Sequence, residues 1–266
     1  MELAQRERII LDSLLEKGAI TVADLSRDLE VSEVTIRSDL NSLEKRGFLR
    51  RVHGGAAPAI HPHILERQNL KPEEKQHIAR EAASLVRDGD TIMVEAGTTT
   101  ALICRYLGGK RDVHVITNSM LAFNTARNNP TLKITLCGGE FKSSTESFVG
   151  PIAEEIIGRF NVNFAFVGTD GFSAQQGITT HLLEGGEIIK VMRKRARETI
   201  LLADSSKYDQ VGPVTIMPLS GVDRIITDSG LPREAIGEMR EDRQILDIRE
   251  ERDSILVRFE ITIKPV

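Results

Sequence analysis

Apolar residues recur at helical spacing in three short segments within the first fifty residues. In the first segment, Ile10, Leu11, Leu14 and Leu15 lie on one face, and Gly18 follows as the residue type expected just after a helix end. Two further segments of this kind follow at short intervals. The pattern therefore predicts a first helix and then a helix, a tight turn and another helix.

Hydroxyl side chains mark where the second and third helices begin. Thr21, with Asp24 three residues later, fits an N-cap, because the hydroxyl can accept from a free backbone amide while the carboxylate lies near the positive helix end. Ser32 fits the same role for the third helix. The inward face of that helix is aliphatic, with Ile36, Leu40 and Leu43 spaced four and three residues apart.

The outward face of the third helix carries side chains suited to reading DNA. At 100° per residue this face holds Val34, Arg37, Ser38, Asn41 and Lys45. Arginine can bond guanine edges in pairs, asparagine can do so with adenine, and an exposed valine can touch a thymine methyl group. The face favours a major-groove reader, and a three-helix packing module with a solvated charged face is the alternative.

A basic segment after the third helix favours DNA binding over that alternative. Residues 48–55 predict a short strand and turn, a wing that lies along DNA phosphates. Residues 1–58 carry nine Lys and Arg against ten Asp and Glu, whereas residues 37–53 carry five basic and two acidic side chains. Positive charge is thus concentrated on the third helix and the wing. The predicted DNA contacts are Ser32, Val34, Thr35, Arg37, Ser38, Asn41, Lys45, Arg50, Arg51 and His53.

This region resembles the winged helix-turn-helix of the DeoR family of bacterial sugar-metabolism regulators. The resemblance is carried by Val31-Ser32-Glu33-Val34-Thr35-Ile36-Arg37-Ser38-Asp39-Leu40, followed by Leu43, Gly47, Leu49, Arg51 and His53-Gly54-Gly55-Ala56. It implies a DNA-binding domain over residues 3–58 with double-stranded operator DNA as partner. Family members usually have two consecutive arginines where this chain has Arg37-Ser38, so we expect weaker attraction to the DNA backbone or an altered operator preference.

The global composition fits a two-domain intracellular protein. The chain has 266 residues, of which 40% are hydrophobic and 28% charged, enough for one small and one medium domain. No stretch approaches the roughly twenty apolar residues of a membrane helix, and the first residues do not form a secretory signal. We therefore expect a cytoplasmic protein without membrane contact. The pI near 5.9 is low for a protein that only binds nucleic acid, so most of the surface is expected to serve another role.

The cysteines and the paired histidines give no sign of a metal site. Cys104 and Cys137 lie far apart without neighbouring ligand residues, so buried free thiols are expected. His61-Pro62-His63 lies in a predicted linker, residues 59–72, bounded by Pro58 and Pro72, and supplies too few donors for a metal. We predict no metal and no cofactor.

Short β-branched runs alternate with helical patterns through residues 73–240. This alternation predicts an α/β domain with a mainly parallel open sheet covered by helices, placed after the winged helix-turn-helix. Strands are predicted over residues 91–95, 113–117, 133–137, 163–168, 199–203 and 224–227, and helices over 73–87, 100–107 and 185–197. Residues 241–266 form an extension, with a turn over 249–253 and a strand over 255–263, to which we assign no function.

Polar residues follow the carboxyl ends of the predicted strands, where open parallel sheets bind ligands. The segment Glu95-Ala96-Gly97-Thr98-Thr99-Thr100 follows the first strand and brings amides, hydroxyls and a helix start together, as an anion requires, although a plain N-cap is the alternative. The Gly168-Thr169-Asp170-Gly171 segment, taken alone, favours an ordinary turn. Together the strand ends predict a polyhydroxylated, phosphorylated small molecule.

The second part of the chain resembles the sensor domain of DeoR-type regulators, which is similar to the ribose-phosphate isomerase fold and binds phosphorylated sugars. The matching residues are Gly97-Thr98-Thr99, Thr117-Asn118, Gly138-Gly139, Ser147, Gly150, Gly168-Thr169-Asp170-Gly171, Glu184 and Asp204-Ser205-Ser206-Lys207. The resemblance implies a sensor domain over residues 73–240. Family members often have aspartate at Glu95 and arginine at Lys142, so a different ligand or pose is expected. The predicted effector contacts are Gly97, Thr98, Thr99, Asn118, Gly138, Gly139, Lys142, Asp170, Gly171, Glu184 and Lys207.

The sequence thus predicts a homo-oligomeric repressor of a carbohydrate operon, controlled by a sugar phosphate. One alternative is a sugar-phosphate isomerase with Asp170, Glu184 or Glu187 as base and Lys207 as electrostatic partner. A catalyst has no need of a winged helix, so we predict that the protein is not an enzyme. A further alternative is a nucleic-acid module whose second domain only dimerises.

Overall fold

The computed structural model describes residues 5–46, 48–58, 62–241, 245–251 and 254–259. The chain divides into two compact units. The smaller unit comprises Met1–Leu70 and Ser143–Thr145, and the larger unit comprises Lys71–Lys142 and Glu146–Val266. Together they confirm the predicted fold class, a winged helix-turn-helix followed by an α/β domain with a mainly parallel sheet.

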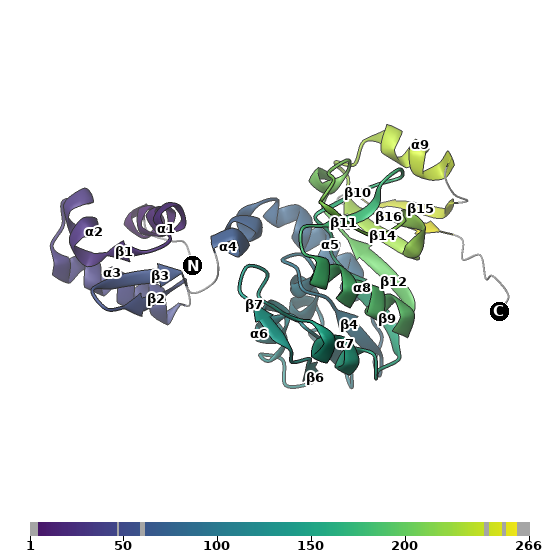
Figure 1. Cartoon of the computed structure of the whole chain (residues 1–266), viewed down its shortest axis with the longest axis horizontal. Helices are drawn as coiled ribbons and strands as arrows, with labels where there is room; N and C mark the ends of the chain where they lie inside the picture. The colour runs from purple at the N-terminus through teal and green to yellow at the C-terminus, as the bar shows by residue number, and fades with distance from the viewer. Residues whose placement is uncertain (1–4, 47, 59–61, 242–244, 252–253, 260–266) are drawn as a thin grey trace. The chain divides into compact units, whose positions relative to one another are not determined.

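Three helices and a small antiparallel sheet make up most of the smaller unit (Figure 1). The helices are α1 (Gln5–Lys17), α2 (Val22–Asp28) and α3 (Glu33–Lys45), and the strands are β1 (Ile20–Thr21), β2 (Leu49–Val52) and β3 (Gly55–Pro58) in the order β1-β3-β2. The predicted strand and turn of the wing correspond to β2 and the turn after it, and β3 is the strand that returns beside β2. The helices bury one aliphatic core, formed by Ile10, Leu14, Ile20, Val22, Leu25, Ile36, Leu40, Leu43, Leu49 and Ala56.

Both predicted N-caps of the smaller unit are confirmed. Thr21 Oγ1 accepts the backbone N–H of Asp24 at 3.1 Å and donates to the Asp24 carboxylate at 2.7 Å. Ser32 Oγ accepts the backbone N–H of Thr35 at 3.2 Å. Each such cap contributes about 1 kcal/mol to helix stability. The caps fix where α2 and α3 begin, and hence which residues of α3 face outward.

The predicted linker contains a helix, α4 (Pro62–Asn69), which the proline spacing did not indicate. Proline is well tolerated in the first turn of a helix, so Pro62 begins α4 without interrupting it. Ile64 is buried and α4 contacts α1, which explains why this short segment is ordered as a helix. Of the paired histidines, His63 is exposed, and His61 lies outside the described residues.

An eight-stranded sheet runs through the larger unit in the order β15-β16-β14-β12-β9-β4-β5-β6. All six predicted strands are present, and neighbours among them are parallel. They are β4 (Thr91–Val94), β5 (His114–Thr117), β6 (Lys133–Leu136), β9 (Val162–Val167), β12 (Ala196–Leu202) and β14 (Arg224–Asp228). The strands on either side of β4 end close to its own end, since Val94 is opposite Thr117, the last residue of β5, and Phe166, the second-last residue of β9.

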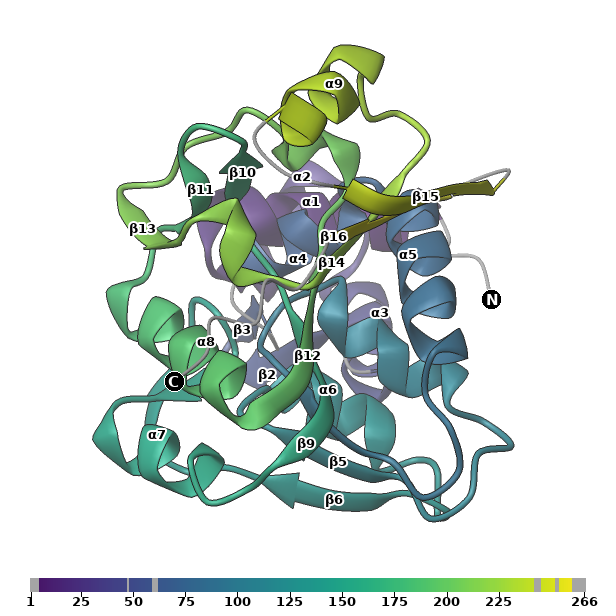
Figure 2. The same cartoon turned by 90° about the vertical axis from the view of Figure 1, so that its right-hand side faces the viewer.

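Helices cover both faces of this sheet (Figure 2). One face holds α5 (Pro72–Ser84) and α6 (Met120–Ala126), with η1 (Thr100–Tyr106) in contact with both, and the other holds α7 (Pro151–Ile157) and α8 (Leu183–Arg195). The predicted helix over 100–107 is a 3-10 helix, because the chain turns tightly there: the Leu102 N–H donates to the Thr99 carbonyl three residues earlier. Within the described part of the chain, none of the helices combines the length and apolar character needed to cross a membrane.

Smaller elements lie around the carboxyl ends of the parallel strands. They are the hairpin β7 (Glu140–Lys142) and β8 (Ser147–Val149), the sheet β10 (Gly171–Ser173), β11 (Gly177–Thr180) and β13 (Val214–Met217), and the 3-10 helices η2 (Ser205–Lys207) and η3 (Leu219–Gly221). The β10-β11-β13 sheet is antiparallel throughout. These elements supply most of the loops that surround the carboxyl ends.

After β14 the chain forms α9 (Arg233–Glu241), and the predicted extension over residues 241–266 contains a hairpin of β15 (Ile245–Glu251) and β16 (Ser254–Phe259), in which β16 pairs antiparallel with β14. The predicted turn is wrong over residues 249–251, which continue β15, and residues 252–253 lie outside the described part. Edge strands tolerate charged residues well, so the charge run did not mark a turn. The predicted strand corresponds to β16, and residues 260–263 are outside the described part.

Candidate functional site

The outer face of α3 presents the residues that the sequence selects for DNA contact. We call Val34, Arg37, Ser38, Asn41 and Lys45 the recognition face. All five are exposed, Val34 at 74%, whereas the inward residues of α3 are fully buried. The capping residue Ser32 is also exposed, and Thr35 is half-buried. The smaller unit therefore offers a helix face whose side chains are not used for the core.

Two side chains of the recognition face, Arg37 and Asn41, bond to neighbours within the smaller unit. Arg37 forms an ion pair with Glu33, one turn earlier, at 2.8 Å. Asn41 Oδ1 accepts a hydrogen bond from Arg51 of β2 at 2.5 Å. Arg50 and His53 of the wing are exposed. The face is thus partly ordered before any partner is bound.

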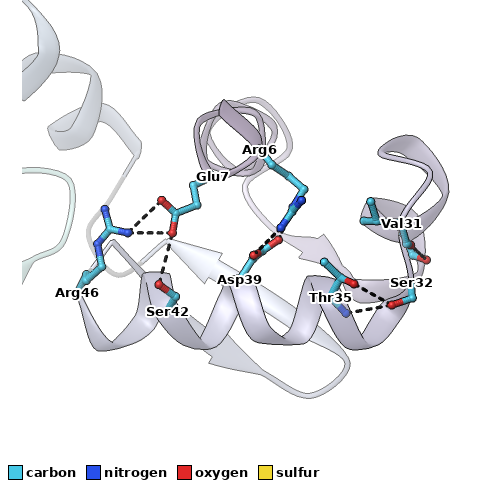
Figure 3. Close-up of polar contacts among 9 residues, drawn as sticks. Arg6, Glu7, Val31, Ser32, Thr35, Asp39, Ser42 and Arg46 are labelled. Carbon is cyan, nitrogen blue, oxygen red and sulfur yellow. Dashed lines mark hydrogen bonds and ion pairs between the residues drawn. The ribbon is translucent and has the colours of Figure 1, made fainter. Parts of the chain in front are cut away.

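Helix α3 is fixed against α1 by two ion pairs and a further hydrogen bond that the sequence analysis missed (Figure 3). Arg6 of α1 donates to both carboxylate oxygens of Asp39, at 2.6 and 3.0 Å, and these contacts raise the pKa of Arg6. Arg46 donates to both carboxylate oxygens of Glu7, at 2.8 and 3.0 Å, and Ser42 donates to Glu7 at 3.4 Å. Opposite charges at the flanks of two amphipathic helices were the available signal, but their pairing depends on how the helices cross.

In the larger unit, the candidate residues gather where the parallel strands end. We call the segments that directly follow β4, β5, β6, β9, β12 and β14 the carboxyl edge. The chain passes from β4 through β5 to β6 on one side, and β9 lies on the other side of β4. The segments after β4 and β9 therefore diverge, which is where open α/β sheets form ligand crevices.

Glu95 joins the two diverging segments. Its side chain is buried, and its carboxylate accepts the backbone N–H of Gly168 at 3.1 Å. Thr100 Oγ1 donates to the Glu95 carbonyl oxygen at 2.7 Å and so closes the loop that contains Gly97. Thr98 and Thr99 of this loop are buried. The loop predicted to cradle an anion is therefore held in place by residues on either side of it.

Asn118 follows β5 and is 1% exposed. Its side-chain Nδ2 donates to the backbone carbonyl oxygen of Phe148 in β8 at 3.0 Å, and the backbone carbonyl oxygen of Asn118 accepts the Phe148 N–H at 2.8 Å. Among the described residues, Asn118 Oδ1 has no hydrogen-bond partner. A buried acceptor without a donor costs free energy, so this oxygen is suited to accept from a bound hydroxyl.

The structure brings together Lys142 and Glu184, which the sequence selected separately. Lys142 Nζ lies 2.8 Å from Glu140 and 3.4 Å from Glu184, at the start of α8. Hydrogen bonds to these carboxylates, to Glu140 first, raise the pKa of Lys142. The pKa of Glu184 is lowered, mainly by a backbone hydrogen bond at its own position and further by Lys142. Both side chains therefore stay charged and hold β7 near α8.

Asp170 holds a histidine that the sequence analysis missed. Its Oδ2 accepts from the Thr180 hydroxyl at 3.0 Å and the His181 N–H at 2.9 Å, and it lies 3.2 Å from His181 Nδ1. The His181 side chain is exposed. A nearby carboxylate favours the protonated, positively charged form of a histidine ring. The available signal was a histidine directly after the strand over residues 177–180.

The candidate glycines differ in what surrounds them. A Cβ on Gly171 would lie 2.0 Å from the Gln210 carbonyl oxygen, and one on Gly139 (φ 147°) would lie 2.6 Å from that of Val149. A Cβ on Gly97 would lie 2.9 Å from Thr100 Oγ1, whereas nothing lies within 4 Å of one on Gly138. Gly171 and Gly139 are thus required by the fold, and Gly138 is free to approach a ligand.

The segment after β12 places Lys207 in η2. Asp204, which is buried, caps this turn by accepting the Ser206 N–H, and the Lys207 N–H donates to the Asp204 carbonyl at 3.0 Å. Asp228 of β14 accepts the Ser205 N–H at 2.6 Å. Lys207 is half-buried. The two aspartates thus act on the backbone, and the lysine is the cation that this segment offers.

The two cysteines lie in the interior of the larger unit. Burial raises the pKa of Cys104 to about 12 and that of Cys137 to about 11. Both are free thiols. In the part of the chain that the structure describes, no three His, Cys, Asp or Glu side chains are grouped so that they could hold a metal ion.

Known proteins resemble the chain along most of its length. Residues 6–59 match the model of the DeoR-like helix-turn-helix domain, and residues 70–229 match that of the DeoR C terminal sensor domain. The lactose phosphotransferase system repressor of Lactococcus lactis is 34% identical over 254 residues, covering 92% of this chain and 99% of that protein. The transcriptional regulator GolR of Listeria innocua is 30% identical over 229 residues, covering 85% and 90%. Among solved structures, ribose 5-phosphate isomerase from Plasmodium falciparum aligns with a TM-score of 0.39 and 17% identity, over 71% of this chain and 78% of that one.

Proposed function

Because the chain belongs to the DeoR family of DNA-binding transcriptional regulators, we propose that it represses a carbohydrate operon and that a phosphorylated sugar controls it. One observation carries the proposal: a single chain combines an exposed recognition face on α3 with a parallel sheet whose carboxyl edge gathers glycine, hydroxyl, amide and lysine groups. The name of the Lactococcus relative, a lactose phosphotransferase system repressor, supports the choice of a carbohydrate operon.

In the proposed complex, α3 enters the major groove and the wing follows the phosphate backbone. Val34, Arg37, Ser38 and Asn41 face base edges, and their exposure supports this role. Ser32, Thr35, Lys45, Arg50, Arg51 and His53 complete the predicted DNA surface. The contacts of α3 with α1 hold the recognition face at a fixed angle, so base contacts are made without reordering the helix.

The proposed effector site is the part of the carboxyl edge that follows β4 and β9. Thr98 and Thr99 line the loop after β4, and Lys207 supplies a positive charge from the segment after β12. A phosphate fits such a group of amides, hydroxyls and a cation. Asn118 Oδ1 and the Asp170 carboxylate, together with His181, are suited to bond sugar hydroxyls. Because Gly138 has no side chain, the ligand can approach the protein backbone closely at that position.

The control of DNA binding follows from linkage between the two sites. We expect the larger unit to mediate homo-oligomerisation, so that several smaller units occupy repeated half-sites of the operator. An effector that binds one state of the oligomer more tightly changes operator affinity by the ratio of its affinities for the two states.

Isothermal titration of the full chain with pentose and hexose phosphates tests the effector site. Binding of at least one sugar phosphate is expected, with loss of that binding in Lys207→Ala and in Thr98→Val. Lys133→Ala is the matched control, because Lys133 is an exposed lysine in β6, away from the carboxyl edge. Undiminished binding in both edge variants would remove the site assignment.

The same mixtures distinguish the alternative functions. Bound sugar phosphate that is recovered unchanged supports a sensor, whereas isomerised product would support an enzyme with Asp170, Glu184 or Glu187 as base. Absence of both binding and turnover across the panel would favour a larger unit that only dimerises.

A further inference from the structure

Arg51 connects the wing to the recognition helix by contacts at both its backbone and its side chain. Its Nη1 donates to Asn41 Oδ1 at 2.5 Å, and its Nε donates to the Gly55 carbonyl oxygen of β3 at 3.1 Å. Its backbone N–H donates to the Glu44 carboxylate of α3 at 2.7 Å. One residue of β2 therefore bonds to α3 twice and to the neighbouring strand once.

The preceding residue, Arg50, has the same side chain and a different environment. Successive residues of a strand point to opposite faces, so Arg50 is exposed while Arg51 is half-buried against α3. Within the part of the chain that the structure describes, Arg50 has no ion pair or side-chain hydrogen bond. The two arginines of the wing thus provide a natural comparison between a free cation and an engaged one.

The contact with Arg51 restricts how Asn41 can read a base. An asparagine that selects adenine uses both ends of its amide: Oδ1 accepts from N6 and Nδ2 donates to N7. In this chain one of the two lone pairs of Oδ1 is already taken by the Arg51 guanidinium, so the adenine N6 amino group would have to share this oxygen with it, whereas the Nδ2 group is left to donate. Guanine presents two acceptors, N7 and O6, and adenine presents N7 as its acceptor in the major groove.

We propose that Arg51 is a positioning residue, which fixes the wing against α3 and favours donation by Asn41 over acceptance from a base. Asn41 then selects a purine through its acceptor atoms, with guanine accepted at least as well as adenine. Arg50 then provides the wing's phosphate contact, and Arg51, which the sequence places among the DNA contacts, acts through Asn41 instead. This inference rests on the proposed DNA binding by the recognition face.

The test is selection of double-stranded oligonucleotides from a randomised pool by the full-length chain, followed by affinity measurements at several salt concentrations. The base position read by Asn41 is the one whose preference disappears in Asn41→Ala. There the wild type should enrich guanine at least as strongly as adenine. Arg51→Ala and Arg51→Lys should both shift that position toward adenine by about tenfold, because Oδ1 becomes available for a bidentate contact.

Arg50→Ala is the matched control. It should leave every base preference unchanged and lower the slope of log affinity against log salt by about one, as expected for one lost phosphate contact. Arg51→Lys keeps the positive charge without the planar fork, so it separates geometry from charge. Thermal unfolding of each variant shows that it is folded.

Three results would overturn the inference. They are a strict adenine preference at the Asn41 position in the wild type, a wild-type preference retained in Arg51→Lys, and a fall in salt slope in Arg51→Ala equal to that in Arg50→Ala. A wild-type chain that enriches no duplex would instead overturn the proposed DNA binding, and the inference with it. The two failures are distinguishable: if the wild type selects a duplex but one of the three results is found, only the inference about Arg51 fails.

Discussion

On the recognition face of α3 the candidate side chains point to solvent, while the opposite side of the same helix holds the core. At the carboxyl edge of the larger unit, by contrast, Glu95 and Asn118 are buried and already bonded to the backbone of neighbouring segments. Candidate binding residues are therefore separate from the folded core in one region and part of it in the other. On α3, the residues proposed to bind lie on one face and the residues that stabilise the fold lie on the other. At the carboxyl edge, the same side chains are proposed to bind and also stabilise the fold.

Substitutions in the two regions should therefore have different effects. Surface substitutions away from the core usually change stability by less than about 0.5 kcal/mol, so variants of the recognition face should alter DNA binding alone. Substitution at the carboxyl edge removes bonds that join strands, so effector binding and stability should fall together. Variants that fail to follow this division would break the comparison.

The largest effect is expected from Gly171→Ala, which should destabilise the larger unit by about 3 kcal/mol. Its new Cβ would lie 2.0 Å from the Gln210 carbonyl oxygen, so β10 or the opposing segment must shift. Gly138→Ala is the matched control, since nothing lies within 4 Å of its Cβ, and its stability should stay within about 0.5 kcal/mol of wild type. Urea denaturation of the two variants measures the difference, and equal midpoints would contradict the structural role of Gly171.

A smaller loss, about 2 kcal/mol, is expected from Glu95→Ala. The substitution leaves the half-buried Gly168 N–H without its side-chain acceptor. Glu95→Gln keeps a side-chain oxygen of the same reach, so it should lose less than half as much. Thermal unfolding measures both, and the larger loss in the glutamine variant would show that the carboxylate charge, and not the acceptor, is what matters at this position.

Arg37→Ala should change DNA binding and not stability, in contrast to the two variants above. Operator affinity should fall about tenfold, or about 1.4 kcal/mol, with stability unchanged. Arg37 is exposed and its ion pair with Glu33 is a surface pair, which contributes little to folding. Arg27→Ala is the control, because Arg27 also forms an exposed ion pair but lies on α2. Fluorescence anisotropy with a selected duplex measures affinity. A stability loss above 1 kcal/mol in Arg37→Ala would break the separation between the faces of α3.

Local patterns accounted for most of the elements because their causes are local. The Thr21 and Ser32 caps and the spacing of Ile36, Leu40 and Leu43 depend on residues within one turn, and the structure confirms them. The six parallel strands are likewise marked by β-branched runs. Helix α4 was missed because the two prolines that bound its segment suggested a linker. Its order comes from contact with α1, which a local pattern does not report.

The candidate sites divide in the same way. The recognition face could be read from helical periodicity, since one helix supplies all of it. At the carboxyl edge, strand order predicts which segments meet, but the bond between Glu95 and Gly168 joins residues 73 positions apart. The pairing of Lys142 with Glu184 and the His181 contact with Asp170 depend equally on the packing of separate segments. Which of these residues contact DNA or effector stays a prediction.

The smallest effect is expected from Asp24 of α2, an exposed carboxylate that contrasts with the buried Glu95. A hydrogen bond from the Thr21 hydroxyl, more than any other contact, lowers the pKa of Asp24 below its ordinary value of 3.8. Since the folded-state pKa is the lower one, the stabilisation is present above about pH 4 and is lost as pH falls through the folded value. Wild type should therefore exceed Asp24→Asn in urea midpoint at pH 6, and this difference should be smaller at pH 2.

Thr21→Val separates the cause of this pH dependence. It removes the hydroxyl that holds the Asp24 carboxylate, so the difference in midpoint between pH 6 and pH 2 should shrink as it does in Asp24→Asn. Urea titrations of the three proteins at the two pH values measure this. If Thr21→Val kept the full wild-type dependence on pH, Arg27 would be the partner that matters. The stability of the smaller unit would then depend on surface charge more than on the cap that positions α2.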